Sequence, residues 1–281
     1  MEVLIVPDAA AAGARGARII AALLRDTPAA VLGLATGETQ RPLYVELVRR
    51  VHAHELRLAA ATTFNLDEFV GVAADHPGSF RRAMRQQLFE LVDVDPTRVH
   101  FPAAASVDEV PEVCARYEAA IEAAGGIDLQ LLGIGEDGHI GFNEPTSSLS
   151  SRTRLKTLTQ RTIDGARAVF SPGEPPRHVV TMGIATILSA RRCLLLATGA
   201  RKARAVAAMV EGPLTAMVPA SALQLHARAT VIVDEAAAAQ LALAAYYRDV
   251  ERCKPAWQRR ADGDDEQAAA VPSALPAPSE P

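Results

Sequence analysis

Residues 133–145 read GIGEDGHIGFNEP, and the apolar run IDLQLL at 127–132 comes directly before them. A short apolar run that ends in glycines is typical of a buried strand. Three glycines within six residues then end the strand and let the backbone turn sharply, close to whatever it faces. The stretch therefore predicts a strand of an α/β protein that delivers polar side chains to its carboxyl end.

Asp137, His139 and Glu144 leave this turn together. A carboxylate beside an imidazole fixes its tautomer and raises its basicity, and a second carboxylate can hold the proton that the ring relays. Aspartate and histidine at this spacing also occur in glycine-rich surface loops, where they are solvated or cap a helix. The three residues alone leave both interpretations open.

The rest of the chain alternates strands and helices around this turn. Apolar runs predict strands at residues 3–6, 30–35, 60–66, 99–102, 127–132, 153–159, 178–182, 193–197 and 229–233. Amphipathic stretches between them predict helices, the last of them at 235–247. This alternation predicts an α/β fold with a single doubly wound, mostly parallel, Rossmann-like sheet and helices on both faces.

The composition divides the chain into two parts. Hydrophobic residues make up 49% of the sequence, which is enough for a sizeable core, and we assign residues 1–253 to one globular domain. From residue 254 the composition shifts to alanine, proline and aspartate without periodicity or apolar bulk. Residues 254–281 are therefore predicted to be a disordered tail.

Polar side chains follow four of the predicted strands. The turn at 36–39, Asp67, the Asp137 loop and Lys202 each come directly after one. Because the carboxyl ends of parallel strands meet at one edge of a sheet, we expect these residues to form a single site. Lys202 stands in the first turn of a helix, where it opposes the helix dipole, and binding an anion explains that position.

Charge and cysteine content narrow the class of protein. Twenty-nine basic and thirty-three acidic residues give a net charge of −4, which argues against a nucleic-acid or anionic-membrane partner but leaves room for a local basic pocket. Cys114, Cys193 and Cys253 are odd in number and far apart, as in reduced cytosolic proteins. No apolar run reaches the roughly 18 residues of a membrane span, and no secretory signal is visible. We expect a cytoplasmic protein.

Five motifs together resemble a known family. They are GIGEDGHIGFNEP, GLATGET at 33–39, TFNLDEFVG at 63–71, ATGARKA at 197–203 and SALQLH at 221–226. In this order they resemble the glucosamine-6-phosphate deaminase (isomerising) family, over roughly residues 1–250. The resemblance implies isomerising deamination of glucosamine 6-phosphate to fructose 6-phosphate and ammonia. It also implies a hydrolase of carbohydrate and amino-sugar metabolism that acts in N-acetylglucosamine catabolism.

The same resemblance implies roles for four catalytic residues. His139 would open the sugar ring with Asp137 and Glu144 as its carboxylate partners, and Asp67 would take the proton from carbon 2. A carboxylate is a weak base in water, so the site has to raise the pKa of Asp67 by burial or through a neighbouring acid such as Glu68. No metal or organic cofactor is implied, because the substrate's own carbonyl accepts the electrons.

The phosphate site that the resemblance implies departs from the family at two positions. The family's phosphate loop and phosphate lysine match Thr36, Gly37, Glu38, Thr39 and Lys202. The family has Gly or Ser at position 38, and a carboxylate there is expected to repel a phosphate. The family also has an arginine where this chain has Ala168, and the adjacent Arg167 is the candidate to replace it.

Four further residues resemble an allosteric site for N-acetylglucosamine 6-phosphate in hexameric members: Ser147, Arg154, Lys156 and Thr157. Since monomeric, unregulated members also exist, a regulated homo-oligomer and an unregulated enzyme both remain open. Three other functions are weighed against the deaminase. A 6-phosphogluconolactonase-like hydrolase or related isomerase would differ around Asn143 and Glu144. A non-catalytic sugar-phosphate sensor would not need all four catalytic groups, and a zinc hydrolase would favour paired histidines.

Overall fold

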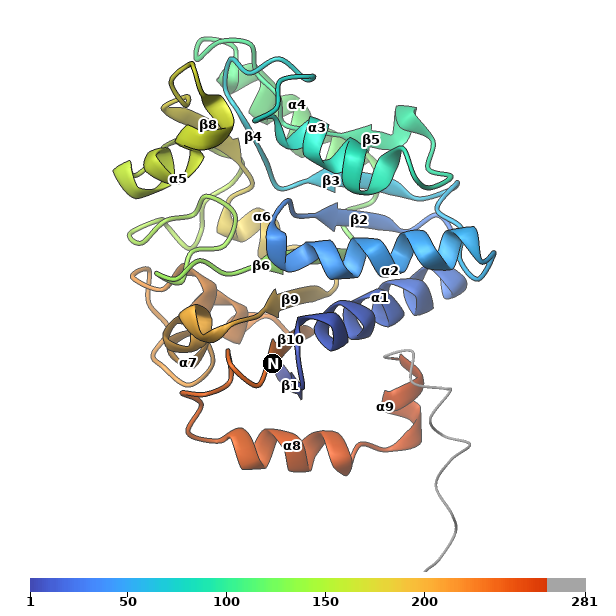
Figure 1. Ribbon diagram of the computed structural model, residues 1–281. Helices are drawn as coiled ribbons and strands as arrows, with labels where there is room; N and C mark the ends of the chain where they lie inside the picture. Colours follow the sequence, from blue (N-terminus) through green and yellow to red (C-terminus); the bar gives the residue numbers. More distant parts are fainter. Residues whose placement is uncertain (262–281) are drawn as a thin grey trace, which may run out of the picture.

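Seven parallel strands form the central sheet of the computed structural model, which describes residues 1–261 (Figure 1). In spatial order they are β1 (Glu2–Val6), β10 (Ala229–Asp234), β9 (Cys193–Ala197), β6 (Leu129–Gly133), β2 (Val31–Leu34), β3 (Thr62–Asn65) and β5 (Val99–His100). From β2 the later strands β3 and β5 follow in one direction, and from β6 the later strands β9 and β10 follow in the other, with β1 at the far edge. The order therefore reverses between β2 and β6, where ligands bind in open parallel sheets.

Helices cover both faces of this sheet, because alternate residues of each strand point to opposite sides. One core joins the strands to α1 (Ala9–Asp26), α2 (Arg41–His52) and the helical segment of α3 (Phe80–Met84) and η2 (Arg85–Phe89). The other core joins them to α4 (Val110–Ala123), α6 (Ile184–Leu188), α7 (Ala203–Val210) and η5 (Pro219–Leu225). The doubly wound fold is confirmed. Within residues 1–261, no helix has the length and apolar character to cross a membrane.

A second, antiparallel sheet was not predicted. It contains β4 (Asp67–Phe69), β8 (His178–Thr181) and β7 (Arg154–Thr157), in that order. The strands at 153–159 and 178–182 are confirmed, but they belong to this small sheet. Only Leu66 separates β3 from β4, so the chain passes from one sheet to the other immediately before Asp67. The prediction of a single sheet is corrected to that extent.

The C-terminal part also differs from the prediction. Residues 235–243 contain no helix, and α8 instead spans Ala244–Arg252. The Glu211 carboxylate accepts hydrogen bonds from the N–H groups of Ala242 and Leu243, which come directly before α8, and so fixes where this helix begins. α9 (Ala256–Ala261) follows inside the segment predicted as a tail. Lys254 is buried there, with its ammonium 2.5 Å from Glu2. The rest of the predicted tail, 262–281, lies outside the described residues.

Candidate active site

A cavity of about 710 Å³ lies where the strand order reverses. Its walls come from segments that follow β2, β3, β6 and β9 and from the start of α5 (Gln160–Phe170). Asp67, Asp137, His139 and Lys202 all line it, together with residues 36–39. The prediction that residues remote in sequence meet at one sheet edge is therefore confirmed by the structure.

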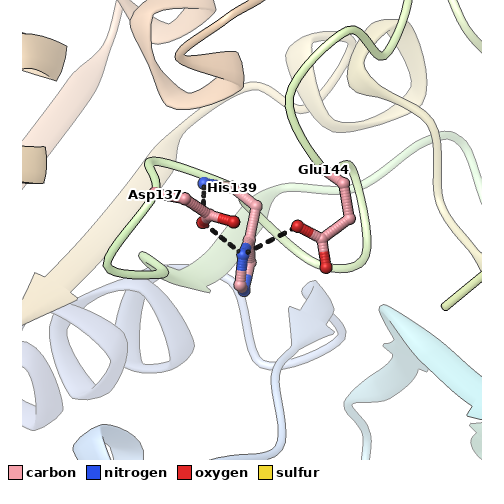
Figure 2. A group of neighbouring side chains, drawn as sticks. All are labelled: Asp137, His139 and Glu144. Carbon is pink, nitrogen blue, oxygen red and sulfur yellow. Dashed lines mark hydrogen bonds and ion pairs between the residues drawn. The ribbon is translucent and has the colours of Figure 1, made fainter. Parts of the chain in front are cut away.

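His139 lies between two carboxylates (Figure 2). Its Nδ1 is 2.6 Å from Asp137 Oδ1 and 3.5 Å from Glu144 Oε2, so both acids face the same ring nitrogen. Among residues 1–261, none makes a hydrogen bond to Nε2. With Nδ1 engaged by the carboxylates, Nε2 is the atom available to exchange a proton with a ligand in the cavity.

The two carboxylates set the charge of the His139 ring. Burial lowers the pKa of His139, but the hydrogen bonds to Asp137 and Glu144 outweigh it and raise the pKa to about 9. The same hydrogen bond holds the pKa of Asp137 well below its usual range. The ring is therefore an imidazolium near neutral pH. The three donor atoms also lie within 4.8 Å of one another, a spacing that could hold a metal ion.

A glycine without a side chain and the side-chain amide of an asparagine explain how the turn holds this geometry. A Cβ at Gly135 would lie 2.2 Å from the His139 ring, so the ring packs where only glycine leaves room. Asn143 Nδ2 donates to the carbonyls of Ile140 and Met182 at 2.9 and 2.8 Å, which fixes the chain just before Glu144. The sequence motif thus encodes the shape of the turn as well as its reactive groups.

Asp67 is the second reactive group of the cavity. Its side chain is buried, and burial, followed by the charge of Glu68, raises the pKa of Asp67 to about 8. Burial and Glu68 thus raise the pKa in the expected direction, and the role of Asp67 as the base stays a prediction. Glu68 itself is held by four hydrogen bonds, including those from the N–H groups of Phe80 and Arg81 at the start of α3.

One side of the cavity is cationic. Lys202 lines it in the turn that begins α7, and burial lowers the pKa of this lysine. Arg201 and Arg161 also line it, and both contact the Glu136 carboxylate. The turn at 36–39 borders the same space at the start of η1 (Glu38–Gln40) and α2, where the first N–H groups lack helical partners.

Two residues expected in the anion site are placed differently. Glu38 borders the cavity, yet its side chain is 84% exposed and pairs with Arg41 at 3.1 Å, which weakens the expected repulsion. Arg167 does not line the cavity and pairs instead with Asp164 and Glu174. The structure therefore gives no support to Arg167 as a substitute for the missing arginine, because its side chain pairs with these acids outside the cavity.

Three residues of the site were missed by sequence reasoning. Arg161 and Thr162 stand in the first turn of α5, and Thr162 Oγ1 donates to Glu144 at 3.1 Å. Gln40 is 2% exposed and lines the cavity, with an amide Nε2 that has no partner among the described residues. Arg161 and Thr162 follow the predicted strand at 153–159, and Gln40 follows the turn at 36–39, but none of the three belongs to a quoted motif, so the sequence analysis did not single them out.

The residues matched to an allosteric site lie outside the cavity. Arg154 and Lys156 are two residues apart on β7 and share a face, as their spacing predicted. Thr157 is exposed at the end of that strand, and Ser147 is buried with an Oγ that has no partner in the described chain. Whether these residues bind a regulator stays a prediction.

Comparison with known proteins gives consistent matches over most of the chain. A family model described as glucosamine-6-phosphate isomerases/6-phosphogluconolactonase matches residues 8–232. The glucosamine-6-phosphate deaminase of Streptomyces coelicolor is 53% identical over 262 residues, which cover 92% of this chain and 99% of that protein. That of Hahella chejuensis is 54% identical over 252 residues, which cover 89% and 96%.

Two solved structures share the fold of this chain at different levels of sequence identity. A monomeric glucosamine-6-phosphate deaminase of the NagB superfamily has 41% identity and a TM-score of 0.81, covering 85% of this chain and all of the other. The 6-phosphogluconolactonase of Trypanosoma cruzi has a TM-score of 0.70 at 21% identity, covering 86% and 97%, which shows the fold alone. The predicted hydrolase class is wrong. The description of the matching family names isomerases, and the relatives near 50% identity are named glucosamine-6-phosphate deaminases.

Proposed function

Because the chain belongs to the family of glucosamine-6-phosphate isomerases and 6-phosphogluconolactonases, we propose that it deaminates glucosamine 6-phosphate to fructose 6-phosphate and ammonia. One observation carries this proposal. A buried carboxylate whose pKa is raised to about 8 shares a cavity with an imidazolium held by two acids. Proton removal beside a carbonyl and ring opening need these two groups.

Ring opening uses the His139 group. The cyclic sugar opens when the ring oxygen gains a proton and the anomeric hydroxyl loses one. Nε2 of His139 carries a proton near neutral pH, and Asp137 and Glu144 stabilise the imidazolium from the Nδ1 side. The ring can therefore give its proton to the sugar oxygen and receive the hydroxyl proton, which returns it to its starting charge.

Isomerisation uses Asp67. In the open-chain aldehyde the hydrogen on carbon 2 is acidic, because the carbonyl at carbon 1 accepts the electron pair. Asp67 removes that hydrogen while the carbonyl oxygen gains a proton, which gives an enol. Return of a proton to carbon 1, with loss of one from the nitrogen, leaves an imine at carbon 2. Water then supplies the ketone oxygen as the nitrogen departs as ammonia. A carboxylate with a pKa near 8 is far stronger as a base than one in water.

Replacement of Asp67 by asparagine tests the assignment. Asp67→Asn should lower kcat by about 10²–10⁴-fold and stop exchange of the carbon 2 hydrogen with deuterium from solvent. Its melting temperature should stay at or above that of the parent, since a neutral amide avoids burying a carboxylate charge. Asp164→Asn, an exposed change on α5, is the matched control and should leave both rates unchanged.

Persistence of exchange at the parent rate in Asp67→Asn would remove this residue from the role of base. Assay of 6-phosphogluconolactone hydrolysis on the same preparation covers the alternative activity of the family. We expect release of ammonia and fructose 6-phosphate without lactone hydrolysis, because relatives near 50% identity are named deaminases and the lactonases share only the fold. Lactone hydrolysis without release of ammonia and fructose 6-phosphate would overturn the proposed function.

The cellular location of the reaction follows from the charge of the substrate. A doubly charged sugar phosphate does not cross membranes unaided, so we place the reaction in the cytoplasm. All groups assigned above come from one chain, and the 41% identical deaminase is described as monomeric. These facts support catalysis by a single subunit. The sequence left the oligomeric state open, and light scattering on the purified protein measures it directly.

A further inference from the structure

Arg161 occupies a position that neither the sequence motifs nor the family's arginine position points to. It stands in the first turn of α5 and lines the cavity, while Arg167, six residues later, lies outside it. The family's arginine position holds Ala168, which does not line the cavity either. A guanidinium is therefore present at the cavity. It comes from the N-terminal end of α5, whereas the family's arginine position lies near the C-terminal end of this helix.

The charges around Arg161 match a phosphate dianion. The side chains of Arg161, Arg201 and Lys202 line one side of the cavity, and Glu136 is the carboxylate that both arginines contact. Burial lowers the pKa of Lys202, and the charges of Glu136, Arg201, Asp137 and Arg161 all act on it. Three cations and Glu136 give a formal charge of about +2 on that side, and the charge of Asp137 is balanced by the His139 imidazolium that it contacts. A sugar phosphate carries about −2 near neutral pH.

The ion pair with Glu136 leaves Arg161 able to bind a ligand. The arginine side chain is 70% exposed and Glu136 is 29% exposed, so the pair is a surface contact that contributes little to stability. A guanidinium has five N–H donors in a planar fork, and one carboxylate does not use them all. Glu136 therefore holds the side chain at the cavity, and the remaining donors stay available for an anion.

We propose that Arg161 binds the phosphate of the substrate, together with Lys202 and the turn at 36–39. The assignment rests on the proposed function only for the identity of the sugar. It makes α5 part of the substrate site: Arg161 reaches the phosphate, and the neighbouring Thr162 bonds to Glu144 of the proton relay. The residue that binds the phosphate and the residue that supports the His139 relay are then neighbours in the first turn of α5.

The test compares Arg161→Gln with Arg167→Gln, a matched change on the same helix outside the cavity. Arg161→Gln should raise KM for glucosamine 6-phosphate at least tenfold and change kcat less than threefold, because a phosphate anchor binds ground and transition states alike. Arg161→Lys should recover part of the loss. Arg167→Gln should stay within twofold of the parent, and circular dichroism melting verifies that each variant is folded.

Calorimetric titration with fructose 6-phosphate separates this inference from the deaminase assignment. At least tenfold weaker binding in Arg161→Gln, with parent affinity in Arg167→Gln, supports the inference even if no ammonia is released. Parent-like binding by Arg161→Gln overturns it and leaves the deaminase proposal standing. Equal weakening in both variants also overturns it, since general loss of positive charge would then account for the effect.

Discussion

At the scale of single residues, the chemistry depends on how the surroundings of Asp67 and His139 set the pKa values of these two side chains. Asp67 is 7% exposed, and burial makes its carboxylate a stronger base than a solvated one, with a pKa of about 8. His139 shows the opposite balance, because Asp137 and Glu144 outweigh burial and favour its charged form. The site therefore holds a base and an acid in the same cavity, and both are in their working forms between about pH 8 and pH 9.

These two groups predict a bell-shaped pH profile. Asp67 has to lose its proton to act as a base, so kcat/KM should rise with pH through about 8. His139 has to keep its proton to open the ring, so kcat/KM should fall as pH passes about 9. Glu144→Gln removes one charge that raises the pKa of His139 and should shift the alkaline fall to lower pH. An alkaline limb that does not move would separate Glu144 from the relay.

Glu38 is predicted to have little effect on substrate binding. Its side chain is 84% exposed and pairs with Arg41, so solvent and the arginine screen it from an anion in the cavity. Glu38→Gly should therefore change KM for glucosamine 6-phosphate by less than about twofold. A fivefold fall in KM would show that the carboxylate turns toward the phosphate when substrate binds.

At the scale of elements, Glu68 connects the catalytic base to a cavity wall. It lies beside Asp67 in β4, and its two oxygens accept hydrogen bonds from the N–H groups of Phe69, Phe80 and Arg81 and from Ser79 Oγ. Three of these donors belong to the start of α3, whose Phe80 lines the cavity. A charged oxygen at a helix N-terminus also interacts favourably with its dipole.

Replacement of this carboxylate should lower both stability and the pKa of Asp67. Glu68→Gln turns one acceptor into a donor that faces N–H or O–H groups, at a cost of about 2 kcal/mol. For a domain of this size the melting temperature should fall by roughly 4–8 °C. The acid limb of the pH profile should move below its parent position, because a charge that raises the pKa of Asp67 is gone. Glu122→Gln, an exposed change on α4, is the control and should alter neither quantity.

At the scale of the whole molecule, the two ends of the described chain meet. β1 is an edge strand of the large sheet, and α8 packs beside it. The Lys254 ammonium lies 2.5 Å from Glu2 of β1 and 3.1 Å from Glu251 of α8, and Glu251 also bonds to Arg15 of α1 at 2.9 Å. This ion network fastens the C-terminal helices to the first strand and helix.

Breaking the network at its centre should destabilise the fold without changing the chemistry. Lys254 is 3% exposed at its side chain, and Lys254→Met leaves two carboxylates without their ammonium. Removing one partner of a fully buried pair costs about 3–5 kcal/mol, and we expect about 2 kcal/mol here because both glutamates are partly solvated. Thermal unfolding should show a fall of several degrees with KM unchanged. Arg116→Met, which breaks an exposed pair with Glu112, should cost less than about 0.5 kcal/mol.

The sequence by itself determined the parallel sheet and the meeting of the main catalytic residues. Apolar runs separated by amphipathic stretches fix the order of strands and helices, and parallel strands place their carboxyl ends together. Asp67, Asp137, His139 and Lys202 therefore reach one cavity because each follows a strand. Glu144 joins them because the short turn after β6 is shaped by residues within it, such as Gly135 and Asn143.

The tertiary structure alone decided which way other side chains point and which partners they have. Arg161 rather than Arg167 faces the cavity because of how α5 packs against the small sheet, which no local pattern specified. Glu38 turns to Arg41, and Lys254 reaches Glu2 across the length of the chain. The pKa of Asp67 likewise depends on burial by remote segments. Local periodicity predicts elements, whereas side-chain contacts and burial arise only once elements distant in sequence have packed together.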